Sequence, residues 1–214
     1  MAQCCIDTTD AYFDEKWVTT RFQRYKKKGP TGTTAKLISF LRRQHLAGYS
    51  LLDVGGGFGT IGHELVGKGL SEVIEVEMSQ ASMHLAQGEA ERRGYADRLR
   101  LVHGDLTDPD LEVADGDVVT LDRVICCYPN ADGLIRTALS KCRHLFGISY
   151  PKSGFYMRAE FFLENLQRRL KKQDFRTFIH PSSEVRALIS NEGFTPVIQD
   201  STILWHIELY QRSP

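Results

Sequence analysis

Apolar and polar positions follow two different periods between residues 46 and 150. Short apolar runs rich in branched side chains recur, and the segments between them carry apolar residues at the spacing of an amphipathic helix. Strand and helix alternating in this way predict a parallel sheet with helices on both faces. The expected strands are 49–54, 72–78, 99–102, one within 117–127, and 145–150, and the expected helices include 81–93 and 131–142.

The two ends of the chain depart from this alternation. The first 44 or so residues are polar and helical in pattern, and two helices are expected after residue 150, over 156–172 and 182–190. Strands at 195–199 and 203–210, separated by only three residues, predict an antiparallel hairpin. We therefore predict one domain over 1–214, divided into an N-terminal helical cap (1–45), a cofactor-binding core (46–150), a lid-helix insertion (151–180), and a last helix with hairpin (181–214).

The composition narrows the class of protein. A hydrophobic fraction of 42% and a charged fraction of 25% are typical of a soluble globular domain. The 27 basic and 27 acidic residues leave no net charge, which argues against a nucleic-acid partner because dedicated nucleic-acid binders are usually strongly basic. No apolar run approaches the roughly 18 residues that span a bilayer, and no secretory signal is visible at the N-terminus.

The number and spacing of the cysteines narrow the class of protein further. Four of the five cysteines form two adjacent pairs, Cys4-Cys5 and Cys126-Cys127, a spacing that suits neither a disulfide framework nor a zinc site. We therefore expect reduced thiols, no metal site and a cytoplasmic protein.

A glycine-rich turn follows the first predicted strand. Asp53 and Val54 lead into Gly55-Gly56-Gly57-Phe58-Gly59, and a helix is expected directly afterwards. Glycine reaches backbone angles closed to other residues and lets a ligand approach the main chain. A helix N-terminus adds free N–H groups that suit an anion or carboxylate, and the Asp53 carboxylate can hold a polar or cationic group. The turn is therefore a predicted ligand site.

The segment 53–59, DVGGGFG, resembles motif I (D-x-G-x-G-x-G) of class I S-adenosylmethionine-dependent methyltransferases. The resemblance extends from about residue 46 to 210. It implies an α/β fold, a doubly wound, seven-stranded, mostly parallel sheet of the Rossmann-like methyltransferase type, with the antiparallel terminal hairpin and a helical lid. It also implies S-adenosylmethionine as cofactor, S-adenosylhomocysteine as product, and cofactor contacts from the glycines Gly55, Gly56, Gly57 and Gly59.

Acidic residues at the ends of the next two strands support this interpretation. Glu77, followed by Met78, ends the second strand, where a carboxylate can accept hydrogen bonds from both ribose hydroxyls. The third strand runs into Asp105 and Leu106, where the resemblance implies contacts to the adenine amino group and a ring nitrogen. Arg123, after the fourth strand, is a further candidate for contact with the cofactor or the substrate wall.

The part of the predicted site that would bind the methyl acceptor is less well defined by the sequence. The resemblance implies that the exit of the fourth strand borders the methyl group, which makes Cys127, Tyr128 and, from the later chain, His180 the candidates for a catalytic role. If the N-terminal helices and the 151–180 segment cover the site, the candidate substrate contacts are Tyr12, Tyr25, Tyr128, Tyr156 and Arg158. The predicted partner is a small-molecule acceptor methylated on oxygen, nitrogen or carbon by in-line transfer.

Several short segments are similar to magnesium-protoporphyrin O-methyltransferases. They are 28–34, 127–129, 149–152, 178–180 and 191–194. That group has a histidine before the Tyr-Pro pair, where this chain has Cys127, so methylation of a tetrapyrrole carboxylate is one option among several.

Two other functions stay open. The spacing Gly57-x-Gly59-x-x-Gly62 also fits a nicotinamide-dependent oxidoreductase, although here the first of these glycines comes late after the strand. The other alternative is a non-catalytic relative that keeps the fold and the cofactor. A nucleic-acid amino-methyltransferase is disfavoured because its Asn/Asp-Pro-Pro-aromatic motif is absent.

Overall fold

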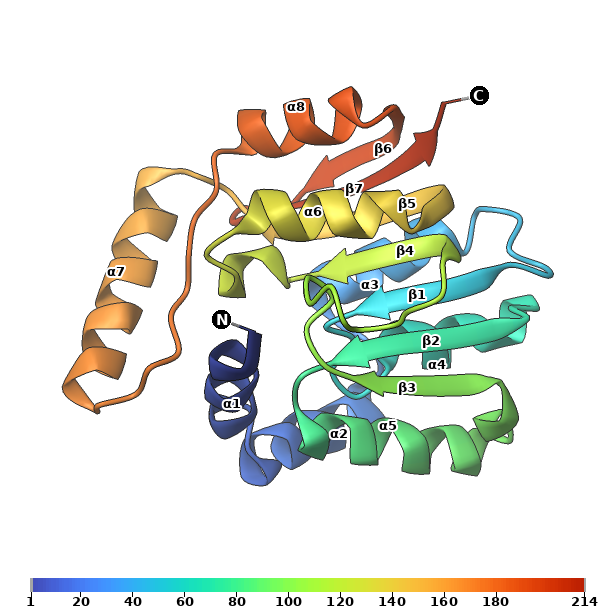
Figure 1. The fold of residues 1–214 in the computed structure, drawn as a ribbon, viewed down its shortest axis with the longest axis horizontal. Coiled ribbons are helices and arrows are strands. Elements are labelled where there is room, and N and C mark those ends of the chain that lie inside the picture. Colours follow the sequence, from blue (N-terminus) through green and yellow to red (C-terminus); the bar gives the residue numbers. More distant parts are fainter. Residues whose placement is uncertain (1, 214) are drawn as a thin grey trace.

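The computed structural model describes residues 2–213, in which a seven-stranded sheet is flanked by helices (Figure 1). The strands lie in the order β3-β2-β1-β4-β5-β7-β6. Their bounds are β1 Ser50–Val54, β2 Glu72–Glu77, β3 Leu99–His103, β4 Gly116–Asp122, β5 Cys142–Pro151, β6 Phe194–Ser201 and β7 Trp205–Arg212. The α-helices are α1 Ala2–Tyr12, α2 Glu15–Lys28, α3 Gly32–Leu41, α4 Thr60–Leu65, α5 Gln80–Arg93, α6 Ala131–Ser140, α7 Phe155–Leu170 and α8 Ser182–Asn191, with short 3-10 helices η1 Val66–Lys68, η2 Ala96–Arg98 and η3 Ile125–Cys127.

The first five strands pair in parallel, and helices cover both faces of the sheet. Leu52 and Val54 of β1 pack into the core beneath α6 and α8, whereas Leu51 packs on the opposite side against α3, α4 and α5. Because both faces are covered, every residue of β1 is buried, and all of its residues except Ser50 and Asp53 are apolar. The predicted doubly wound sheet is confirmed.

The terminal hairpin also matches the prediction. β7 inserts antiparallel between β5 and β6, with Gly147 opposite Leu209. The turn has the expected three residues but lies at 202–204 instead of 200–202, so the predicted strand 203–210 starts two residues too early. Thr202 Oγ1 accepts hydrogen bonds from the backbone N–H groups of Leu204, at 3.3 Å, and Trp205, at 3.0 Å. This side-chain bonding holds Ile203 in the turn, where it is 91% exposed.

A second boundary differs between α6 and β5. The helix was expected to continue to residue 142, but it ends at Ser140, and Cys142 already begins the strand. Arg212 of β7 donates hydrogen bonds to the carbonyl of Cys142 at 2.7 and 2.9 Å. A partner from the far end of the chain therefore moves this boundary, and local helix periodicity could not predict it.

The helices α1 and α2 lie beyond the carboxyl ends of the central strands (Figure 1). Two hydrogen bonds attach α1 to the start of α5. The Ser79 hydroxyl donates to the Phe13 carbonyl at 3.0 Å, and the backbone N–H of Gln80 donates to Asp10 Oδ1 at 2.9 Å. On the other side, the Tyr12 ring stacks on Phe175, with centroids 4.1 Å apart. The N-terminal helices thus bridge two parts of the fold.

Helix α7 stands at the edge of the molecule, away from the sheet (Figure 1). Only Met157 and Phe161 along it are buried, where they pack against Cys126. An irregular segment, residues 171–181, then returns along the helix to α8.

Candidate functional site

A cavity of about 680 Å³ opens at the carboxyl ends of the parallel strands. Turns after β1, β2, β3 and β4 form its base, and α1, α2 and residues 174–178 supply further walls. Every predicted cofactor-binding residue except Gly59 lines this cavity: Asp53, Gly55, Gly56, Gly57, Glu77, Met78, Asp105, Leu106 and Arg123.

The glycine turn has the geometry that requires glycine. Gly55, Gly57 and Gly59 have φ of 64°, 65° and 75°, in the left-handed region that L side chains rarely adopt. Gly56 needs its missing side chain for a different reason, since a Cβ there would lie 2.8 Å from Asp53 Oδ2 and 2.9 Å from Glu75 Cγ. The main chain at Gly56 therefore packs directly against the buried side chains of Asp53 and Glu75.

Asp53 offers one unused oxygen. Its Oδ1 accepts a hydrogen bond from the Thr120 hydroxyl at 2.6 Å, whereas Oδ2 is buried and has no hydrogen-bond partner among residues 2–213. Burial, helped by the charges of Asp122 and Glu77, raises the pKa of Asp53 to about 7. A buried acceptor beside a cavity is costly until it is paired, so Asp53 is set to receive a donor or cation there.

Glu77 ties the glycine turn to the end of β2. Its Oε2 accepts the backbone N–H of Gly57 at 2.8 Å, and its Oε1 accepts the N–H groups of Met78 and Ser79 at 2.9 and 2.8 Å. Burial raises the pKa of Glu77, and these three amide hydrogen bonds oppose that rise. Oε1 already accepts two hydrogen bonds, whereas Oε2 accepts one and keeps a lone pair that can accept from a ligand hydroxyl.

Asp105 is buried after β3 and accepts three hydrogen bonds, which leave one lone pair on its Oδ2. Thr107 donates to its Oδ1 from both backbone and hydroxyl at 2.9 Å, and the Tyr128 hydroxyl donates to its Oδ2. Tyr128, predicted as a catalytic or substrate residue, therefore lines the cavity from a position fixed by Asp105.

The exit of β4 is bent by Arg123, which has φ of 64° although it is not glycine. Its backbone N–H donates to the carbonyl and the hydroxyl of Ser149, both at 3.1 Å. The same turn places Cys127 in the cavity lining, 3.8 Å from the Cys126 sulfur. The contact with the Cys126 thiol lowers the pKa of Cys127; burial opposes this effect and the positive charge of Arg123 supports it.

Residues 51–146 match the family model of a methyltransferase domain. This segment, somewhat less than half of the chain, is thus similar to methyltransferase domains. The prediction of a methyltransferase domain with a Rossmann-like fold is confirmed for this segment and for the sheet. The antiparallel β7 also sets the sheet apart from the all-parallel dinucleotide-binding fold of the oxidoreductase alternative.

The chain is similar to known proteins both in sequence and in structure. The ribosomal protein L11 methyltransferase of Pelotomaculum thermopropionicum is 28% identical over 112 residues, which cover 50% of this chain and 35% of that protein. The crystal structure of magnesium protoporphyrin IX methyltransferase from Synechocystis PCC 6803, with bound SAH, has a TM-score of 0.71 at 18% identity, covering 95% of this chain and 98% of that one.

A further neighbour shows the limit of fold evidence. The [4+2]-cyclase SpnF has a TM-score of 0.65 at 12% identity, covering 83% of this chain and 80% of that one. A cyclase and methyltransferases thus share the fold, so the reaction must be argued from the residues of the cavity.

Two predicted acceptor-side residues lie far from the cavity of the methyltransferase domain. Tyr156 is 82% exposed on α7, and Arg158 on the same helix donates to the Ser153 carbonyl at 3.2 Å. Because the buried side of α7 is occupied by Met157 and Phe161, neither residue points towards the cavity lining. The expectation that they contact a substrate there does not fit this structure.

Tyr12 and His180 act as supports. Tyr12 stacks on Phe175, which does line the cavity, and accepts a hydrogen bond from Arg168 at 3.3 Å. His180 Nε2 lies 3.0 and 3.1 Å from the carbonyls of Ile125 and Tyr128 and so holds the η3 turn from behind. Neither residue lines the cavity as a direct catalytic or substrate contact.

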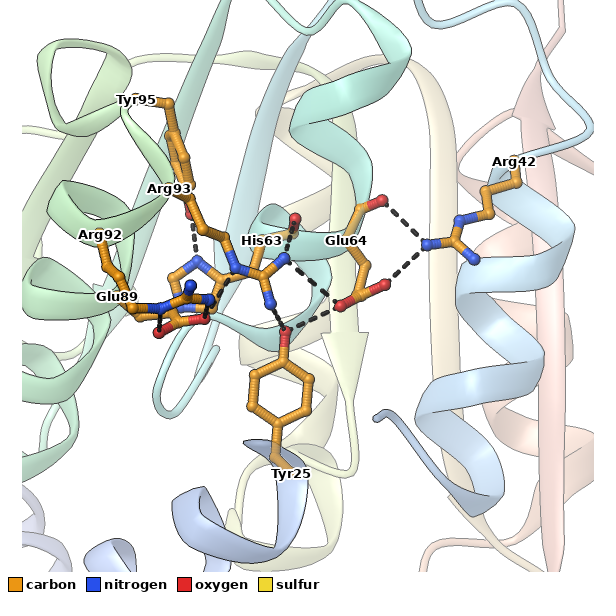
Figure 2. A network of polar contacts seen from close by, with 8 residues as sticks. All are labelled: Tyr25, Arg42, His63, Glu64, Glu89, Arg92, Arg93 and Tyr95. Atoms are coloured by element: carbon orange, nitrogen blue, oxygen red, sulfur yellow. Dashed lines mark hydrogen bonds and ion pairs between the residues drawn. The ribbon is translucent and has the colours of Figure 1, made fainter. Parts of the chain in front are cut away.

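Tyr25 lines the cavity, but its hydroxyl faces a polar network formed with residues of α4 and α5 (Figure 2). It donates to Glu64 Oε1 at 2.9 Å and accepts from Arg93 at 2.7 Å. Glu64 also binds Arg42 at 2.7 Å, and Arg93 binds Glu89 at 2.8 Å. Burial and the hydrogen bond to Glu64 raise the pKa of Tyr25, so the hydroxyl stays protonated and anchors α2 to α4 and α5.

Sequence reasoning missed part of the site. Trp17 of α2 was expected as a lid contact, but Arg21 and Arg24, which line the cavity with it, were missed. Their spacing of four and three residues places all three on one helix face, a signal that was present in the sequence. Phe13 and Phe178 complete an aromatic wall. Their convergence depends on the fold, since they are far apart along the chain.

A second omission lies beneath the glycine turn. Glu75 in the middle of β2 is fully buried, and neither of its carboxylate oxygens has a hydrogen-bond partner in the described part of the chain. Burial raises the pKa of Glu75 well above its usual value. The neutral, protonated acid is thus the form that this site tolerates.

Proposed function

We propose that the chain transfers a methyl group from S-adenosylmethionine to a small-molecule acceptor that carries a negatively charged group. The observation behind the proposal is the distribution of charge in the cavity. Most carboxylates of the lining come from the ends of the strands, with Asp174 as the exception, whereas three of its four arginines come from the covering elements. These are Arg21 and Arg24 from α2 and Arg176 from the segment after α7; the fourth, Arg123, lies at the β4 exit.

The strand-end residues fit this cofactor. Asp53 has the unpaired buried oxygen that an ammonium group would satisfy, and the glycine turn leaves the main chain open beside it. Oε2 of Glu77 would accept a ribose hydroxyl, and Oδ2 of Asp105 with the N–H of Leu106 would receive the adenine edge. S-adenosylmethionine supplies a methyl group already activated by its sulfonium, so the residues of the chain have mainly to bind, orient and exclude water.

The arginines of α2 favour an anionic acceptor. Arg21 packs over the Trp17 ring at 4.0 Å, and no ion pair joins it or Arg24 to a carboxylate within residues 2–213. Arg21, Arg24 and Arg123 line the same cavity, and burial together with the charges of Arg123 and Arg24 lowers the pKa of Arg21. Like charges repel one another, so a bound anion would relieve the repulsion.

The aromatic wall adds a second requirement for the acceptor. Phe13, Trp17 and Phe178 present rings in the same cavity, which suits a flat or apolar body attached to the anionic group. A carboxylate acceptor is already ionised at neutral pH and needs no general base, in keeping with the absence of a histidine from the described cavity lining.

The cofactor half is tested by calorimetry with S-adenosylhomocysteine. We expect micromolar binding, equivalent to about 8 kcal/mol, and a loss of roughly 1.5 to 3 kcal/mol in Glu77→Ala and in Asp105→Ala. Glu72→Ala, at the opposite end of β2 and outside the cavity lining, is the matched control and should bind normally. Binding of a reduced nicotinamide instead would overturn the assignment.

The acceptor half is tested by transfer of a labelled methyl group to paired compounds, each carboxylate set against its neutral amide. We expect transfer to carboxylates, with KM raised about tenfold by Arg21→Gln or Arg24→Gln and no change in affinity for S-adenosylhomocysteine. Arg100→Gln, exposed on β3 and outside the cavity lining, should behave as wild type. Cofactor binding without transfer to any acceptor would favour the non-catalytic alternative.

A further inference from the structure

Helix α7 carries a face of large apolar side chains that nothing in the described chain covers. Phe162 is 67% exposed and Leu170 is 77% exposed, although both types of side chain are normally buried. The other exposed apolar residues of this helix are Phe155, Tyr156, Leu163 and Leu166. Together with the small Ala159 we call these seven positions the α7 apolar face.

The seven positions form one continuous stripe. At about 100° per residue they fall within an arc of about 120°, and no charged residue lies inside that arc. The buried residues Met157 and Phe161 point to the other side of the helix, against Cys126. Helix α7 is therefore apolar on two sides, one packed on the protein and one exposed.

A further exposed apolar residue lies in the β6–β7 turn, near the start of α7. The backbone N–H of Lys152, just before α7, donates to the Leu204 carbonyl at 2.8 Å, which places the turn beside the start of the helix. Ile203 in that turn is the most exposed large apolar residue of those described. A patch of this extent on a protein surface marks an interaction site.

The charge around this face is positive. Residues 152–176 contain seven basic and three acidic side chains, in a chain whose net charge is zero. Arg169, Lys171 and Lys172 are exposed at the end of the helix and make no ion pair within residues 2–213. Lysine and arginine stems can extend from an apolar face so that the charged ends reach a polar boundary.

We propose that the α7 apolar face lies in the surface of an anionic lipid bilayer. A helix with an apolar stripe, aromatic residues and flanking cations is the form that binds at the boundary between headgroups and acyl chains. A second copy of the chain fits less well, because symmetric pairing would bring two segments of the same positive sign together. The helix lies on the lipid, and no helix within residues 2–213 is long and apolar enough to cross a membrane.

Docking in this way has a consequence for the cavity. The segment after α7 supplies Asp174, Phe175, Arg176 and Phe178 to the cavity lining. A lipid-bound α7 would therefore hold one wall of the cavity at the membrane surface, where apolar molecules with a charged group accumulate. The lipid contact itself does not depend on the proposed methyl transfer.

The test is flotation of the full chain with vesicles of pure phosphatidylcholine and with vesicles of equal parts phosphatidylcholine and phosphatidylserine. We expect the chain to float with the anionic vesicles, and Phe162→Glu combined with Leu166→Glu to weaken this binding by about tenfold or more. Lys171→Gln combined with Lys172→Gln should weaken binding to the anionic vesicles by a similar factor. Val197→Glu, an exposed apolar residue of β6, is the matched control and should leave binding unchanged.

Circular dichroism and binding of S-adenosylhomocysteine show whether each variant is folded, and all of these positions are exposed. Absence of flotation with both vesicle types would overturn the proposal, as would flotation that survives the Phe162→Glu and Leu166→Glu pair. A dimer seen by sedimentation, and dissociated by that pair, would assign the face to a second copy instead.

Discussion

The hydroxyl of Tyr128 donates a hydrogen bond to Oδ2 of Asp105, joining the turn after β4 to the turn after β3. The same hydroxyl lies 2.6 Å from the hydroxyl of Thr107. Tyr128 therefore helps to fix the carboxylate that is proposed to receive the adenine of the cofactor. The sequence suggested a catalytic role for Tyr128, whereas the structure favours a positioning role.

Replacement of Tyr128 by phenylalanine separates these two roles. We expect Tyr128→Phe to weaken binding of S-adenosylhomocysteine by about three- to tenfold, because one hydrogen bond to the buried Asp105 is lost. With saturating cofactor, kcat should stay close to that of the wild type. A fall in kcat of a hundredfold or more with unchanged cofactor affinity would instead make Tyr128 a catalytic residue.

Affinity for the cofactor should depend on pH through Asp53. Burial raises the pKa of this carboxyl to about 7, so Asp53 is neutral below that pH and ionised above it. An ammonium group favours the ionised form, and affinity for S-adenosylhomocysteine should rise up to about tenfold between pH 6 and pH 8. Calorimetry over that range should show the rise in the wild type and a flat profile in Asp53→Asn. A flat wild-type profile would contradict the assignment.

Gly56 should be intolerant of even one added carbon. A Cβ there would lie within 3.0 Å of both Asp53 and Glu75, so Gly56→Ala should lower the free energy of unfolding by about 1 to 3 kcal/mol. Gly88 provides the matched control, since a Cβ at that position in α5 meets nothing within 4 Å. Gly88→Ala should raise stability by about 0.5 to 1 kcal/mol. Chemical denaturation of both variants measures the difference, and equal effects would contradict the packing described.

Stability should fall in mild acid because of His63. Burial lowers the pKa of His63 to about 4, with the Arg93 charge adding to the effect, whereas the unfolded chain has the ordinary value of 6.5. As the pH falls below 6.5 the unfolded state gains a proton that folded His63 does not take, so stability is lost down to about pH 4. The contribution is on the order of 3 kcal/mol. The free energy of unfolding, measured by denaturation between pH 7 and pH 4, should fall more steeply with falling pH in the wild type than in His63→Gln. Parallel profiles would show that another group is responsible.

The local sequence was enough to predict the strands, the glycine turn and the carboxylates at the strand ends. These features depend on short-range rules: apolar runs mark buried strands, and glycine marks backbone angles that other residues avoid. Residues at the ends of consecutive parallel strands share one edge of the sheet, so Asp53, Glu77 and Asp105 could be placed in one site before any contact was known.

Only the tertiary structure brought together the residues of the part of the cavity that is proposed to bind the methyl acceptor. Arg21 of α2, Arg123 of the β4 exit and Phe178 after α7 meet in one cavity although more than a hundred residues separate the first from the last. It also determined that Tyr156 and Arg158 lie away from the cavity and that one apolar stripe of α7 is exposed. The periodicity of a helix shows which of its side chains share a face, but the element that packs against that face comes from elsewhere in the chain, and its position depends on the free energy of the whole fold.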